Sequence, residues 1–297
     1  MAEVRIPVDL FNPGQVFACL GLMEAAGVLL GDVEGTFDWR DAAQTLFVLR
    51  AAGEEDPLLA VLDFLRQAEV LAWAPEGSPH LEEPIKSKEA KAVIVVRETS
   101  PQMPFPSPDK GRDKLPAILR HAGRDICIHY WAEPRGYTGR DNVKFWAGAS
   151  GYPGVALLKD ALNLMDGLWE EARDDPFNIA VPQSSSFRLD WRRDYVPLVT
   201  GFSLNQHKHI ITVGYPLVEI LAAIGLSHAR PCRIDKLDYR YAIMGRDDEQ
   251  TCHPPMFLRA VLGGATLPFP VRRFRMQLDW PGKEGQARCI TNVYEEN

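Results

Sequence analysis

An apolar segment near the start of the chain limits the possible folds more than any other feature. Residues 13–30, PGQVFACLGLMEAAGVLL, place hydrophobic side chains on nearly every side of a helix. Asn12 can cap this helix, Pro13 suits its first position, and Gly31 ends it. A helix that has no polar face must be surrounded by other parts of the protein, so we expect it at the centre of the fold.

A second apolar helix is predicted over residues 216–226, PLVEILAAIGL, and it resembles the first one. Each of the two segments begins near a proline and contains a Gly-Leu pair after a run of small and branched apolar residues. Because the match is short, it favours two buried helices that obey the same packing rules, with a weak internal duplication as the alternative.

The segments around the first helix predict an α+β fold. Alternating and β-branched residues indicate four strands, and an apolar stripe after Asp56 indicates a second helix. The expected order is strand 4–10, helix 13–30, strands 36–39 and 45–49, helix 57–67 and strand 70–73. This βαββαβ order predicts a ferredoxin-like N-terminal core, the type found in RNA-recognition motifs and RAMP-like domains, with a plain α+β core as the alternative.

Charge divides the chain near residue 85. Residues 1–85 contain four basic and fifteen acidic residues, whereas the whole chain has a net charge of −7, so the remainder is mildly basic. We therefore predict an acidic ferredoxin-like part, residues 1–85, and a mixed α/β part, residues 86–297, with a proline-rich surface loop at 98–116. The acidic part would face protein or solvent and the basic part would face phosphate, with chance asymmetry as the alternative.

The composition is that of an ordinary soluble protein, with 46% hydrophobic and 25% charged residues. We expect no membrane-spanning segment, and the first residues, MAEVRIPVDLF, lack the basic and apolar regions of a secretory signal. The five cysteines lie far apart and form no CxxC pair. These features predict a reduced, cytoplasmic protein that holds no metal and no other cofactor.

Three segments of the second part combine cations with aromatic rings. The first, residues 134–165, opens as a glycine-rich loop and ends as an apolar helix. Cations neutralise phosphates and aromatic faces stack on bases, so these segments are candidate nucleic-acid-binding sites, with ordinary exposed loops as the alternative. The candidates are Arg135, Tyr137, Arg140, Lys144 and Trp146 in the first segment, Arg188, Arg192 and Arg193 in the second, and Arg233, Lys236 and Arg240 in the third.

The third segment also predicts a strand, KLDYRYAIM, that would place Lys236, Asp238 and Arg240 on one face.

No catalytic motif accompanies the basic segments. The chain contains no phosphate-binding GxxxxGK[ST] loop, no GxGxxG loop after a strand, no GxSxG elbow and no HExxH helix. We therefore expect a binding protein rather than an enzyme.

Five stretches of sequence resemble one protein family. They are IPVDLFNPGQVFACLGLMEAA, VKFWAGASGYPGVALLKDALNL, SSFRLDWRRDY, VGYPLVEILAAIGLSHARP and KLDYRYAIMG. In these stretches the chain resembles the Csb-type subunit of type I-U CRISPR systems, also grouped with type I-G (Dpsyc), a large-subunit-like component of the Cascade surveillance complex. The stretches are spread over most of the chain, and none of them is a catalytic signature.

The resemblance implies a non-catalytic subunit that binds guide RNA, target DNA or both, together with other Cascade subunits, in antiviral defence. In such complexes base pairing reads the sequence and protein subunits hold the backbones. A guide-RNA-gripping backbone subunit of the same complex is one alternative. A metal-independent ribonuclease that processes guide RNA through His129, His207 or His209 is another, and an unrelated cytoplasmic enzyme is a third.

Overall fold

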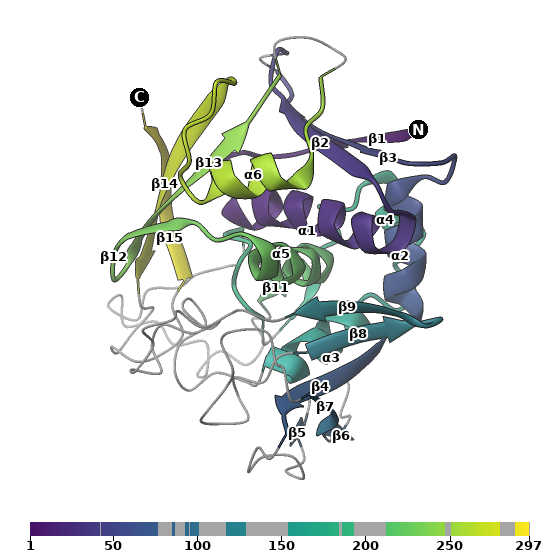
Figure 1. Ribbon diagram of the computed structural model, residues 1–297. Helices are drawn as coiled ribbons and strands as arrows, with labels where there is room; N and C mark the ends of the chain where they lie inside the picture. Colours follow the sequence, from purple (N-terminus) through teal and green to yellow (C-terminus); the bar gives the residue numbers. More distant parts are fainter. Residues whose placement is uncertain are drawn as a thin grey trace.

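Helix α1 (Pro13–Leu30) lies at the centre of the computed structural model (Figure 1). All of its residues from 13 to 26 are buried, as the sequence predicts. The Asn12 side chain accepts a hydrogen bond from the Gly14 N–H at 3.1 Å, and Gly31 ends the helix with a φ of 94°. The structure describes residues 1–41, 43–76, 85–86, 93–94, 96–100, 117–128, 154–183, 186–192, 212–246, 251–279 and 289–296.

The expectation about membrane-spanning segments needs one correction. By length and composition α1 could cross a bilayer, since its 18 residues have a mean hydropathy of 1.5. However, 78% of this segment is buried inside the protein. The core helix of a soluble protein meets the same criterion, so the apolar character of α1 is explained by its packing.

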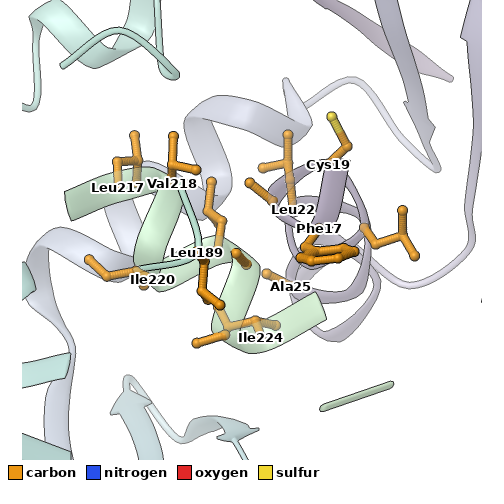
Figure 2. Packing of buried hydrophobic residues seen from close by; sticks show 14 of the residues in the cluster. Phe17, Cys19, Leu22, Ala25, Leu189, Leu217, Val218, Ile220 and Ile224 are labelled. Carbon is orange, nitrogen blue, oxygen red and sulfur yellow. The ribbon is translucent and has the colours of Figure 1, made fainter. Parts of the chain in front are cut away.

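The second apolar helix, α5 (Pro216–His228), packs directly against α1. One glycine of each helix lies where the two backbones come closest. A Cβ atom built on Gly21 would lie 1.7 Å from the carbonyl oxygen of Leu221, and one built on Gly225 would lie 2.2 Å from that of Phe17. The contact is reciprocal, because each glycine meets the carbonyl four residues before the other. Figure 2 shows apolar side chains of both helices, together with Leu189, in this shared core.

The two helices run in the same direction. Near their N-terminal ends, Gly14 and Glu219 both contact residues 189–190. Near their C-terminal ends, His228 Nδ1 lies 3.6 Å from a carboxylate oxygen of Glu24. The positive ends of both helix dipoles therefore lie at the same end of the core.

The N-terminal sheet contains only three of the four predicted strands. It has the antiparallel order β1-β3-β2, formed by β1 (Ala2–Pro7), β3 (Leu46–Ala51) and β2 (Val33–Asp38). Helix α2 (Pro57–Gln67) follows, and β4 (Glu69–Pro75) then joins a different sheet, of order β7-β4-β8-β9. The α+β class is confirmed, whereas the ferredoxin-like core is not, because β4 pairs with β7 on one side and β8 on the other.

Local sequence does not reveal this exchange, since alternation of side chains marks a strand without naming its neighbour. β8 (Ala117–His121) and β9 (Arg124–Ile128) form a tight hairpin whose two turn residues, Ala122 and Gly123, have φ values of 48° and 75°. β8 pairs antiparallel with β4, while β7 (Val96–Ser100) pairs parallel with its other edge. The sheet thus joins strands from both parts of the chain that the charge pattern distinguishes.

A four-stranded antiparallel sheet covers the other side of α1, at the left of Figure 1. Its order is β12-β13-β14-β15, formed by β12 (Cys232–Asp235), β13 (Asp238–Met244), β14 (Val271–Asp279) and β15 (Cys289–Glu296). The Tyr241 hydroxyl donates a hydrogen bond of 2.7 Å to the carbonyl of Leu10, and its ring stacks on Phe274 at 5.3 Å. These contacts fix the Tyr241 face of the sheet to the core, and Asp238 and Arg240 are partly exposed on the opposite face.

The remaining described elements are short. They are α3 (Gly154–Leu164), α4 (Glu171–Asp174), α6 (Pro255–Leu262), the strand pair β10 (Val181–Pro182) and β11 (Val213–Gly214), and the pair β5 (Ile85–Lys86) and β6 (Val93–Ile94). The elements from β11 to β14 repeat the order βαββαβ seen from β1 to β4. This order and the reciprocal glycine contact agree with the weak internal duplication that the sequence leaves open.

Candidate nucleic-acid interface

Only part of the predicted site can be located. In the first candidate segment, the apolar helix predicted at its end is present as α3. The candidate residues of that segment, Arg135, Tyr137, Arg140, Lys144 and Trp146, lie outside the described residues, as does Arg193. The same holds for His129, His207 and His209 of the ribonuclease alternative. Of the predicted loop 98–116, residues 98–100 belong instead to strand β7, and residues 101–116 lie outside the described residues. The candidates within the described residues are Arg188, Arg192, Arg233, Lys236 and Arg240.

Arg192 is held firmly within the fold. Its guanidinium donates to both carboxylate oxygens of Asp190, to the Asn178 side chain at 2.6 Å and to the Phe177 carbonyl at 2.6 Å. The guanidinium carbon also lies 3.6 Å from the ring centroid of Tyr215. These contacts give Arg192 a structural role that the sequence prediction did not include.

Asp190 belongs to a buried polar cluster that we call the helix junction, formed by Asn12, Asp190, Arg192 and Glu219. Asp190 is 1% exposed and accepts a hydrogen bond of 2.9 Å from the Asn12 side chain. Glu219 is 2% exposed and accepts from the N–H groups of Leu189 and Asp190 at 2.9 and 3.1 Å. The junction therefore ties residues 189–192 to the starts of α1 and α5.

Two buried carboxylates suit this position, because the positive ends of two helix dipoles favour negative charge there. Sequence analysis missed the junction, although a signal exists: Glu219 is the one charged residue in the apolar run PLVEILAAIGL.

Arg188, a candidate of the second segment, lies beside the junction with a φ of 64°. Burial lowers the pKa of Arg188, while the nearby Glu219 carboxylate acts in the opposite direction.

The candidates of the third segment do not share one surface. Arg233 lies opposite Tyr239 in the β12–β13 pair, so it belongs to the core-facing side of the sheet. The prediction that Lys236 starts the strand is wrong, because Lys236 lies in the turn between β12 and β13. Arg240 and Asp238 share the outward face, which confirms that part of the prediction.

On the outward face Arg240 belongs to a row of side chains that crosses the sheet. Arg240 on β13 lies directly opposite Arg275 on β14, and Arg275 lies opposite Tyr294 on β15. The Tyr294 residue is 39% exposed, and the Arg240 side chain is 37% exposed. Neighbouring strands are about 5 Å apart, so the backbone positions of the two arginines and the tyrosine lie within about 10 Å.

The row on one side is polar, because Gln277 lies opposite both Asp238 and Asn292. In the row on the other side, Arg273 lies opposite Glu296 and the buried Ala242. We call this surface the arginine–tyrosine face. It consists of Asp238, Arg240, Arg273, Arg275, Gln277, Asn292, Tyr294 and Glu296.

The residues between them, such as Tyr241, Phe274 and Val293, are buried on the opposite side. Sequence analysis missed Gln277, although the alternation in VRRFRMQLD signals an outward polar row, and it also missed Asn292 and Tyr294 on the neighbouring strand.

Ion pairs organise the arginine–tyrosine face. Arg240 and Glu296 form a two-pronged pair, in which Arg240 Nη2 donates to Glu296 Oε1 at 3.1 Å. Arg275 pairs in the same manner with Asp238, through a hydrogen bond of 2.8 Å from its Nε. The hydrogen bond from Arg240 lowers the pKa of Glu296 and raises the pKa of Arg240 in turn. Three arginines thus face two carboxylates, which leaves a small positive excess.

Comparison with protein-family models, curated proteins and solved structures found no match to the chain. Within the described ranges, no group of three or more His, Cys, Asp or Glu side chains is placed to hold a metal ion. The side chains of the arginine–tyrosine face can form two-pronged cationic hydrogen bonds, amide hydrogen bonds and ring stacking.

Proposed function

We propose that the chain is a non-catalytic subunit of a type I CRISPR Cascade-like surveillance complex. In this role it binds guide RNA, target DNA or both, and it contacts neighbouring Cas subunits in the cytoplasm. The observation that supports this most is the row formed by Arg240, Arg275 and Tyr294 on an outward sheet face. The sequence stretches that resemble the Csb-type family provide independent support.

Arginine suits such a role because its planar guanidinium binds two oxygens of a phosphate at once. An exposed tyrosine next to it can stack on a base of any sequence. A surface of this kind holds a backbone without reading its sequence, which is what a Cascade subunit needs when base pairing supplies the specificity. In this proposal the β1-β3-β2 sheet with α1 and α2 is a ferredoxin-like core whose fourth strand has moved to the neighbouring sheet.

The first test is assembly. The chain would be co-expressed with the proteins encoded beside it and with a guide RNA, and the complex would be purified through a tag on another subunit. We expect the chain and the RNA to elute together in one ribonucleoprotein. A complex that assembles and protects its RNA without this chain would contradict the proposal.

The second test addresses the sheet face. Arg275→Gln should weaken nucleic-acid binding by similar factors for all sequences and should lower the salt slope of log K by about 0.7 on a single strand. Arg120→Gln is the matched control, because Arg120 forms a similar two-pronged pair with Asp125 on the β8–β9 hairpin. Equal salt slopes for both variants and the unchanged protein would show that Arg275 contacts no phosphate.

A third experiment, an RNA cleavage assay, tests the catalytic alternative. If the purified chain cleaves repeat RNA without a metal, and if His207→Ala and His209→Ala abolish the cleavage, the protein is a processing ribonuclease and the non-catalytic proposal fails. Several copies of the chain along one guide RNA would instead identify it as the backbone subunit.

A further inference from the structure

We propose that the arginine–tyrosine face binds a short single-stranded segment of nucleic acid, with backbone phosphates at Arg240 and Arg275 and one base stacked on Tyr294. This inference rests on the proposed function and adds the class of ligand and the position of its parts. The ligand could come from guide RNA or from a displaced DNA strand, and the two share the chemistry that the face recognises.

The exposure of Tyr294 and its position in the sheet indicate where the base would bind. Tyr294 is one of the few large apolar side chains at least a third exposed among the described residues, and it lies on β15, at one end of the strand order. In the next row, the Asn292 side-chain N–H donates a hydrogen bond of 3.1 Å to the Gln277 side-chain oxygen. An aromatic ring beside a pair of amides offers a base both a stacking surface and hydrogen-bonding groups for its edge.

The place of the phosphates follows from the ion pairs. Arg240 donates two hydrogen bonds to the Glu296 carboxylate, and Arg275 donates in the same way to Asp238. Both guanidinium forks are therefore already oriented by oxygen pairs on the outward face. A phosphate presents oxygens to an arginine fork in the same manner, so it can replace one of the carboxylates. Glu296 then acts as a competitor of the bound backbone.

The ligand should be single-stranded because of the geometry of stacking. In a duplex each base is already stacked on its neighbours and paired through its edge, so its face is not available to Tyr294. Proteins that contact unpaired segments use aromatic side chains on a sheet in this way. An acidic protein would gain little from the Tyr294 ring or the Gln277–Asn292 amides, and the small positive excess would attract it only weakly.

The direct experiment titrates the full-length chain with fluorescein-labelled oligo(U), oligo(dT) and duplexes of matched length, followed by fluorescence anisotropy at several salt concentrations. We expect both single strands to bind more tightly than either duplex. Tyr294→Ala should weaken single-strand binding about 5- to 150-fold, and Tyr294→Phe, which keeps the ring, should restore most of it. Tighter binding of one single strand would identify the RNA or the DNA source.

Glu296→Gln provides a variant whose effect has the opposite sign. Because it removes a competing carboxylate from a partly exposed pair, it should tighten binding about 1.5- to 5-fold. A protein that merely misfolds cannot bind more tightly, so this gain separates competition from damage. Equal affinity of the unchanged protein and Tyr294→Ala, or duplexes that bind as tightly as single strands, would overturn the inference.

Cross-linking of the purified complex distinguishes a failure of this inference from a failure of the proposed function. Ultraviolet cross-linking with a photoreactive base should yield nucleotide adducts on β13–β15. If the chain enters the complex but β13–β15 cross-link only to a neighbouring protein, the face is a protein interface and only this inference fails. If the chain does not enter the complex at all, the proposed function fails, and the titration with free oligonucleotides then decides about the face alone.

Discussion

Replacing Gly21 by alanine should strongly destabilise the protein, because the new methyl group has no space. A Cβ atom there would lie 1.7 Å from the Leu221 carbonyl oxygen, whereas real Cβ contacts are essentially never under 3.0 Å. The obstacle is helix backbone and cannot rotate away. Helices α1 and α5 would therefore have to separate by more than 1 Å along their closest contact.

The expected magnitude combines two opposing effects. Overpacking a tight core costs about 1–3 kcal/mol and sometimes more, and a clash with backbone belongs at the upper end. Alanine gains about 1 kcal/mol over glycine in a helix. We therefore expect a net loss of at least about 2 kcal/mol for Gly21→Ala. A similar loss is expected for Gly225→Ala, whose Cβ would lie 2.2 Å from the Phe17 carbonyl.

Urea denaturation followed by circular dichroism would measure these losses. Gly263→Ala is the control, since its Cβ would meet only ordinary contacts at 3.6 Å and its φ is −74°. The double variant is informative as well, because one separation of the helices relieves both clashes. Its loss should be clearly smaller than the sum of the single losses. Unchanged stability of Gly21→Ala, or full additivity, would refute the reciprocal glycine contact.

Two further predictions concern buried charges. Arg192→Gln should destabilise the protein by about 3 kcal/mol, because it leaves the buried Asp190 without its cation. Arg66→Gln, in an exposed pair with Glu170, should cost less than about 1 kcal/mol. Urea denaturation of both variants measures these losses. The hydrogen bond from Arg40, assisted by Arg246, lowers the pKa of Asp38, so its stabilising contribution is complete above the unfolded pKa of about 4 and is lost as the pH falls below it. The stability difference between the unchanged protein and Asp38→Asn should therefore shrink with acidification over that range, and a difference independent of pH would contradict this reasoning.

The sequence predicts those helices, caps and strands that are determined by residues close together in the chain. Hydrophobic side chains on all sides of residues 13–30 predict a buried central helix, and the structure confirms this, including the Asn12 cap. The second apolar helix and the strand containing Asp238 and Arg240 are confirmed in the same way. Each of these features is set by spacing or capping within about 20 residues.

What the sequence does not predict depends on contacts between distant segments. The partners of β4 come from residues 96–121, and no local pattern in the strand indicates them. The arginine–tyrosine face needs the register between β13, β14 and β15, which places Arg240, Arg275 and Tyr294 side by side. Arg192 has the composition of a phosphate ligand, but only the position of Asp190 reveals its role in the fold.

The pairing of α1 with α5 has a consequence for how the protein is made. A ribosome that adds about 5–20 residues per second needs about 10–40 s to extend the chain from Leu30 to His228. During that time α1 has emerged without the helix that buries its glycine face, so the nascent chain presents a strongly apolar segment to its surroundings. Folding of the core is therefore a late event in synthesis, and fragments that end before α5 should aggregate or be retained by chaperones.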